Sequence, residues 1–251
     1  GVSNFFDANF YVLTTARNVY KCLDNDNNTA STVEPTGTST TVLSTADGYK
    51  WKYMYTLSAS QQANFLSTDF MAVATNSTVS SAAVDGAIDI VKIKTPGTGG
   101  ANGTHTGIAI RGDGSNGQVS VTVAGGVVTA VTVTNAGTGY TFGTISNAQI
   151  VAAGATSLSG AELDVIIPPK GGHGKNAVEE LGGFYVMLNT SLEGTESGNS
   201  GDVTVANDFR KISLIRDPKA AGSAATATTL RGTKAINLTG VSGSYAVSYT
   251  H

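Results

Sequence analysis

The chain has 251 residues, which is enough for one large all-β domain or two domains of ordinary size. Charged residues make up only 13% of it and glycine fills 31 positions, which favours strands joined by tight turns over helical bundles with charged outer faces. The net charge of −3 and the lack of a basic run give no support for a nucleic-acid partner. A single cysteine, Cys22, excludes an intrachain disulfide and a cysteine-based zinc site, and no apolar run is long enough to span a membrane.

Three segments in the first sixty residues predict strands, namely 11–14, 19–23 and 49–57. In the third segment a period of two places four aromatic residues on one face, Tyr49, Trp51, Tyr53 and Tyr55. Such a face could stack on bases or sugars, but with few basic neighbours it favours a place in a core or an interface. A short helix is expected over 60–66, with Ser58 or Ser60 as its cap.

The polar run at 24–28 predicts a loop, because Asn and Asp side chains bond to their own backbone and tolerate left-handed geometry. Asp24, Asp26 and Asn28 stand at the first three ligand spacings of a calcium-binding loop. Thr29 and Pro35, however, occupy the positions where such a loop needs Gly and a bidentate Glu. The segment is therefore interpreted as a solvated turn without a metal.

From Ile88 the chain becomes rich in Gly and Thr and alternates cleanly, which predicts strands at 88–94, 118–123 and 127–133. The Gly125-Gly126 pair predicts a two-residue hairpin turn between the last two. Residues 91–100 are echoed by residues 131–140 at an offset of 40, since both copies run from a strand into a Gly-Thr-Gly turn. The echo indicates a small β-module built from related halves.

After Gly160 the earlier style of sequence returns, with predicted strands at 163–167 and 184–188 and a helical turn over 176–181. The closing segment 207–218 concentrates apolar residues and paired charges, which indicates a buried strand. We therefore expect a mainly β chain with few short helices. A β-sandwich-like parent domain, residues 1–84 and 155–251, is interrupted by a Gly/Thr-rich β insertion at 85–154.

No motif with catalytic chemistry stands out in this pattern. The glycine-rich loop 171–176 lacks the spacing of a phosphate-binding loop, and we interpret it as a flexible loop placed for a neighbouring subunit. His105, His173 and His251 are too scattered to form a short-range metal site, and no serine nucleophile elbow is present. The sequence predicts no catalytic residue, no cofactor and no bound metal.

The chain resembles the gene-eight-type baseplate wedge proteins of T4-like contractile-tailed phages, in their cyanophage-like form. The motifs that carry the resemblance follow the family order and cover about half of the chain. They lie at 19–24, 33–35, 47–53, 171–174, 181–190 and 208–218. The Gly/Thr-rich insertion is not part of the family pattern, so its role stays open.

The resemblance implies a non-enzymatic virion protein of the tail baseplate, assembled in the host cytoplasm. It also implies a homodimer that contacts other wedge subunits. The residues expected in its core or interfaces are Tyr49, Trp51, Tyr53, His173, Phe184, Phe209, Arg210 and Arg216. The alternative is a carbohydrate-binding or depolymerising tail protein that displays the inserted module, in which only Tyr140 and Phe142 could stack on a sugar.

Overall fold

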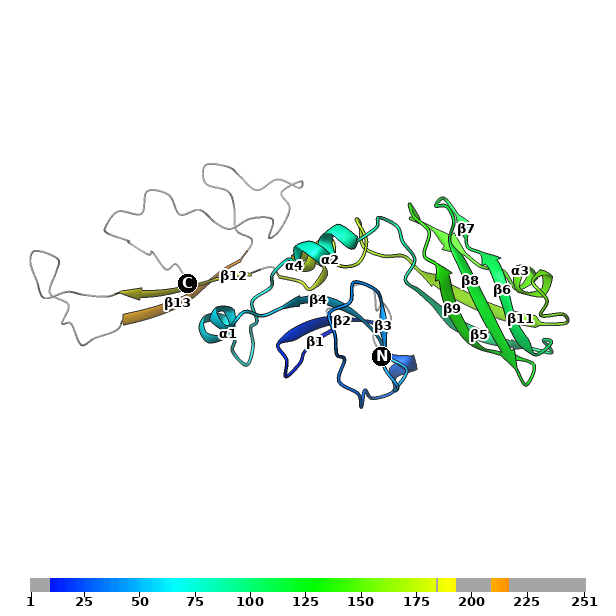
Figure 1. Cartoon of the computed structure of the whole chain (residues 1–251), viewed down its shortest axis with the longest axis horizontal. Coiled ribbons are helices and arrows are strands. Elements are labelled where there is room, and N and C mark those ends of the chain that lie inside the picture. The colour runs from blue at the N-terminus through cyan, green and yellow to red at the C-terminus, as the bar shows by residue number, and fades with distance from the viewer. Residues whose placement is uncertain (1–9, 184, 193–208, 217–251) are drawn as a thin grey trace, which may run out of the picture. The chain divides into compact units, whose positions relative to one another are not determined.

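The computed structural model describes residues 10–183, 185–192 and 209–216, and these residues are mainly β with four short α-helices (Figure 1). This confirms the expected fold class. The chain divides into two compact units, of which the first ends at Gly182 and the second begins at Gly183. Among the described residues no helix has the length and apolar character needed to cross a membrane.

The first strands form an antiparallel sheet of order β1-β2-β4-β3. Its members are β1 (Tyr11–Leu13), β2 (Asn18–Asp24), β3 (Leu43–Ser44) and β4 (Lys50–Thr56). Both faces of the central strands β2 and β4 are buried, each by its own hydrophobic cluster. Within the first unit the described parent residues thus form one sheet covered on both faces, and the sandwich arrangement stays a prediction.

A β-bulge changes the expected alternation of the aromatic strand. Val19 pairs with Tyr55 and the next residue, Tyr20, pairs with Tyr53, so Met54 is the extra residue on β4. Met54 and Tyr55 consequently pack together in one cluster with Val19. The prediction that Tyr55 shares a face with the other three aromatic residues was therefore wrong, because the period of two does not survive a bulge.

Short helices and turns follow local signals in the sequence. Helix α1 (Ala59–Phe65) begins with a capping box in which the Ser58 hydroxyl accepts from the amide of Gln61. Helix α2 (Ser77–Ala82) follows, capped by Asn76. The turn η1 (Asp26–Asn28) has three consecutive residues at φ of 45°, 55° and 70°, as expected for an Asp/Asn loop.

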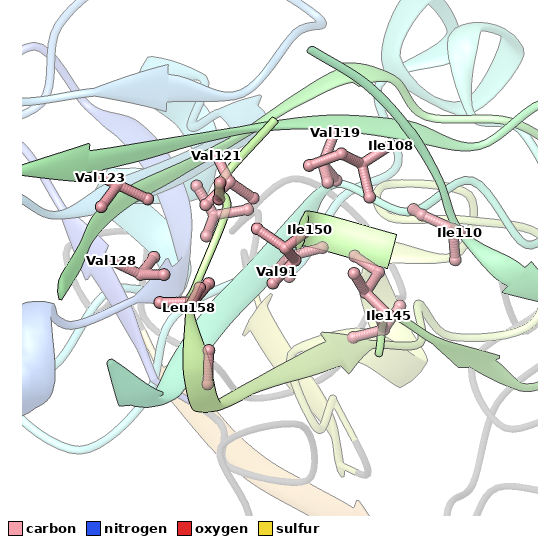
Figure 2. Close-up of a cluster of buried hydrophobic side chains, with 14 of the residues drawn as sticks. Val91, Ile108, Ile110, Val119, Val121, Val123, Val128, Ile145, Ile150 and Leu158 are labelled. Carbon is pink, nitrogen blue, oxygen red and sulfur yellow. The ribbon is translucent and has the colours of Figure 1, made fainter. Parts of the chain in front are cut away.

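The Gly/Thr-rich module contains three small sheets and one helix. Strands β6 (Gly103–Ala109), β8 (Gln118–Ala124) and β9 (Val127–Asn135) form one sheet, while β5 (Ile90–Thr98) pairs with β11 (Ser159–Ile166). β7 (Arg111–Gly112) pairs with β10 (Gly143–Thr144), and α3 (Asn147–Ala152) follows. One hydrophobic cluster collects side chains from these sheets and from α3 (Figure 2).

Strand β11 extends this module beyond the expected boundary at residue 154. It pairs with β5 from Ile166 opposite Ile90 to Ser159 opposite Thr98. Ala161 and Val165 on β11 also belong to the module's hydrophobic cluster. The segment through Ile166 therefore packs with the insertion, whereas the sequence analysis assigned it to the parent domain.

The internal echo has a counterpart in backbone geometry. Both glycines of each Gly-Thr-Gly turn take a left-handed φ, of 67° and 76° in the first copy and 64° and 75° in the second, at Gly97, Gly99, Gly137 and Gly139. The copies differ in their pairing. The first stays in β5 as far as Thr98, opposite β11, and the second makes an isolated bridge from Thr138 to Ser115.

The entry and exit of the module are bonded to each other. The carboxylate of Asp85 accepts from the amide of Gly171 at 2.6 Å, and its main-chain oxygen accepts from the amide of Gly139 at 2.8 Å. At Gly172, with φ at +88°, a Cβ atom would lie 2.3 Å from the carbonyl oxygen of Val84. The chain therefore enters and leaves the module at one place.

The second unit is described as one antiparallel pair, β12 (Tyr185–Leu192) with β13 (Phe209–Arg216). The register runs from Tyr185 opposite Arg216 to Leu192 opposite Phe209. The strand expected in the closing segment is thus present. Phe184 and the side chains of Phe209, Arg210 and Arg216 lie outside the described part of the structure, so their roles stay predictions.

Candidate functional site

Three of the predicted core or interface residues are buried together in one cluster, Tyr49 just before β4 and Trp51 and Tyr53 on it. The Trp51 ring stacks on Tyr49 at a centroid distance of 5.4 Å and on Phe10 at 6.2 Å. Trp51 is 1% exposed, so its faces are not available to a base or a sugar. The aromatic residues are consequently core residues and do not form a surface on which a ligand could stack.

An open pocket of about 350 Å³ lies beside this aromatic cluster, bounded by residues 12–15, residues 31–35, Phe10 and Trp51. Its size falls at the lower end of the range for ligand sites. One wall is tied to the other through Glu34, whose Oε1 accepts from the amide of Thr15 at 3.1 Å and from its hydroxyl at 2.9 Å. The pocket therefore has walls fixed by hydrogen bonds.

Asp47 fixes the wall of the pocket that residues 31–35 form. Its Oδ2 accepts from the Ser31 hydroxyl and the Thr32 amide, both at 2.8 Å, and from the Val33 amide at 3.0 Å. The Asp47 pKa lies well below its usual range, first because of the hydrogen bond from the Thr45 hydroxyl and then because of these three donors. This carboxylate is therefore held ionised by bonds that fix the wall.

Trp51, which lines the pocket, carries an unpaired buried donor. The indole Nε1 of Trp51 is the one buried side-chain nitrogen or oxygen without a hydrogen-bond partner in the described part of the chain. An unpaired buried donor costs about 1–3 kcal/mol. Such groups in a folded protein call for an explanation, and a missing ligand is one.

Apolar side chains stand exposed along the neighbouring strand β1. Phe10, Tyr11 and Leu13 are 41%, 39% and 36% exposed. Single exposed apolar residues are common, but Phe10 and Leu13 also line the pocket, which favours a contact surface here. The surface formed by Phe10, Tyr11 and Leu13 together with the pocket is called the β1 edge below.

His173, predicted in the core or at an interface, is buried inside the fold. Its Nδ1 lies 2.5 Å from Oε1 of Glu180, whose Oε2 accepts from the amide of Gly174 at 2.7 Å. Glu180 lies at the end of helix α4 (Ala177–Glu180), and Lys21 donates to its main-chain oxygen at 2.9 Å. His173 and Glu180 are each 7% exposed, so this part of the loop is packed within the first unit.

The anion in this glycine-rich loop is thus the protein's own carboxylate. Burial alone would raise the pKa of Glu180, but the hydrogen bond from His173, its charge and the Gly174 amide outweigh burial and lower that pKa. Each oxygen of the Glu180 carboxylate thus has a partner within the fold, which is the arrangement of a structural joint.

In the module, Asp113 organises the loop that carries the two aromatic residues. Its carboxylate accepts from the hydroxyl and amide of Thr141 and from the amide of Phe142, which lowers the pKa of Asp113 to about 2. Tyr140 is buried, and its hydroxyl bridges the Ile110 carbonyl and the Gly117 amide. Phe142 is 61% exposed, so it alone of the two could meet a sugar.

Sequence reasoning found the buried aromatic cluster but missed the β1 edge and the role of Glu34 in the pocket. The uninterrupted apolar run at 10–13 was the available signal, since a half-buried strand would alternate with polar residues. In the described ranges no group of three His, Cys, Asp or Glu side chains could hold a metal ion.

No family model, curated protein or solved structure matches the chain.

Proposed function

We propose that the chain is a structural subunit of a phage tail baseplate wedge, which acts by protein–protein assembly without catalysis. The proposal begins with the motif series at 19–24, 47–53, 171–174 and 208–218, which resembles gene-eight-type wedge proteins. The partners are other wedge subunits and a second copy of the chain. The location is the baseplate of the virion.

The observation that carries the proposal is the β1 edge, where three apolar side chains stand exposed beside a pocket. Assembly proteins need such surfaces, because apolar area removed from water drives association. The polar groups that could have served a reaction support the same function. Asp47, Asp113 and Glu180 are each held by several hydrogen bonds within the described structure.

The test is co-expression of the full chain with the proteins encoded next to it, followed by affinity capture and mass measurement of the complex. We expect a homodimer that joins a defined complex with at least one neighbour. A double substitution, Tyr11→Ser with Leu13→Ser, should weaken that complex while leaving the fold intact, because both side chains are more than a third exposed and neither belongs to a hydrophobic cluster. A chain that stays monomeric and captures none of these proteins would refute the proposal.

A second function, carbohydrate binding by the module, is favoured by one observation. Phe142 is 61% exposed on a loop fixed by Asp113. Aromatic side chains offer their faces to sugar rings. Glycan-array binding by the full chain that disappears in Phe142→Ala, but not in a variant of the exposed Val84, would support this function over the first.

A further inference from the structure

We propose that the β1 edge binds an extended peptide strand of a partner subunit, neutral or basic in sequence, which pairs with β1 and seats a side chain in the pocket. The inference rests on the proposed function for the source of the strand. The binding itself depends only on this chain and can be measured with peptides. Addition of a strand to a sheet edge is a common mode of peptide recognition.

The first argument comes from the backbone of β1. The amide of Cys22 donates to the Phe10 carbonyl, and the amide of Thr14 donates to the Asn18 carbonyl. These bonds place residues 10, 12 and 14 in the hydrogen-bonded positions of the ladder with β2, so the N–H and C=O groups of Tyr11 and Leu13 point away from β2. In the sheet described here β1 is the terminal strand, so these groups stand at an edge.

An open edge of this kind is a template for another strand. Natural sheets protect such edges with charged residues, proline or bulges. β1 has none of these, since its three residues are Tyr11, Val12 and Leu13 and its register with β2 is unbroken. The edge is therefore suited to a partner.

The second argument comes from the pocket and the unpaired indole. Trp51 lines the pocket, and its Nε1 has no partner among the described residues. Phe10 stacks on the Trp51 ring, is itself 41% exposed and also lines the pocket. In the proposed complex its ring turns outward and opens the indole edge. A peptide carbonyl is the acceptor that an extended strand brings in a row, and it would satisfy the indole N–H.

The third argument is charge. Glu34 lines the pocket, and Asp47 lies behind the same wall through its bonds to residues 31–33. The described lining contains no Lys or Arg. An acidic peptide or a free carboxylate would be repelled, whereas a neutral or basic strand is accepted.

The probe is a blocked peptide, acetyl-Lys-Val-Thr-Val-Thr-amide, titrated into the ¹⁵N-labelled full chain. Trp51 is the one tryptophan in the sequence, so the indole region of the spectrum holds a single signal. We expect that signal and the amides of Tyr11 and Leu13 to shift saturably. The matched peptide with Glu in place of Lys should bind roughly fivefold more weakly, and Glu34→Gln should abolish that difference.

Two variants separate strand addition from simple filling of the pocket. Leu13→Pro removes an outward N–H, which an edge strand tolerates, and should weaken binding about tenfold relative to Leu13→Ala. Equal binding by the two variants would refute the pairing, and an unchanged indole signal at saturating peptide would refute the pocket. Trp51→Phe keeps an aromatic ring, although a smaller one, and loses the N–H donor, so unaltered affinity for the peptide would refute the role of the indole.

The controls make failure interpretable. If Leu13→Pro loses the native amide spectrum, the comparison of the Lys and Glu peptides on wild type and on Glu34→Gln still decides the charge argument. If no peptide binds while the complex with neighbouring proteins forms, the strand inference is wrong and the proposed function stands. If the complex also fails to form, both are wrong.

Discussion

The buried pair of His173 and Glu180 is the place where one substitution should change the stability of the parent sheet most clearly. Glu180→Ala removes the acceptor of the His173 Nδ1 and of the Gly174 amide, which leaves two donors unpaired where no water reaches. Breaking a buried charged pair from one side costs about 3–5 kcal/mol. Glu180→Gln keeps the shape and one acceptor, so it should cost about 1.5–3 kcal/mol.

Urea unfolding followed by tryptophan fluorescence measures both losses, because the single indole, Trp51, lies on β4 next to the strand that carries Lys21. Lys21 donates to the main chain at Glu180, so the joint and the sheet are connected. Glu179→Gln is the matched control, since Glu179 is the exposed neighbour on the same helix. It should stay within about 0.5 kcal/mol of wild type.

The pH dependence has a definite sign. The folded pKa of Glu180 lies below its ordinary value, so the carboxylate stabilises the fold fully above the unfolded pKa of about 4.3. That contribution is lost as pH falls through the folded pKa. The difference between wild type and Glu180→Gln should therefore be constant from neutral pH to about pH 5 and shrink in more acid solution. The reasoning fails if Glu180→Ala unfolds like Glu179→Gln, or if the difference widens on acidification.

Three further predictions concern the module and use its thermal unfolding as the measurement. Gly86→Ala should destabilise the module by more than about 3 kcal/mol, because a Cβ atom at residue 86 would lie 2.2 Å from the Tyr140 amide nitrogen. Gly139→Ala has open space around the new Cβ atom, so it should cost only the strain of the left-handed backbone, about 1–2 kcal/mol. Ile150→Ala, fully buried on α3, should cost about 2–5 kcal/mol, and a loss below 1 kcal/mol would contradict the core assignment. Asp113→Asn should remove the loss of stability that wild type shows between about pH 4 and pH 2, because its carboxylate titrates at about 2 when folded and stabilises the loop only while ionised.

Elements that depend on neighbouring residues were predictable from the sequence. The cap at Ser58 and the strand at 118–123 follow from side chains within a few positions of each other. The Gly125-Gly126 hairpin likewise shows the two left-handed residues that its turn requires. Each of these depends on interactions that close over a short stretch of chain.

Features that depend on a distant partner were not predictable in the same way. The bulge at Met54 exists only against β2, and β11 belongs to the module only because β5 lies beside it. His173 stands in a glycine-rich run that suggests an exposed loop, and only the turn of α4 brings Glu180 under it. The pocket was missed because residues 31–35 meet β1 only in the folded chain.

The bond between Asp85 and Gly171 has a consequence for how such a chain can change over time. A segment whose two ends already touch can be removed or exchanged by recombination, and a short turn closes the gap without pulling on the sheet that remains. The parent and the module can therefore diverge at different rates.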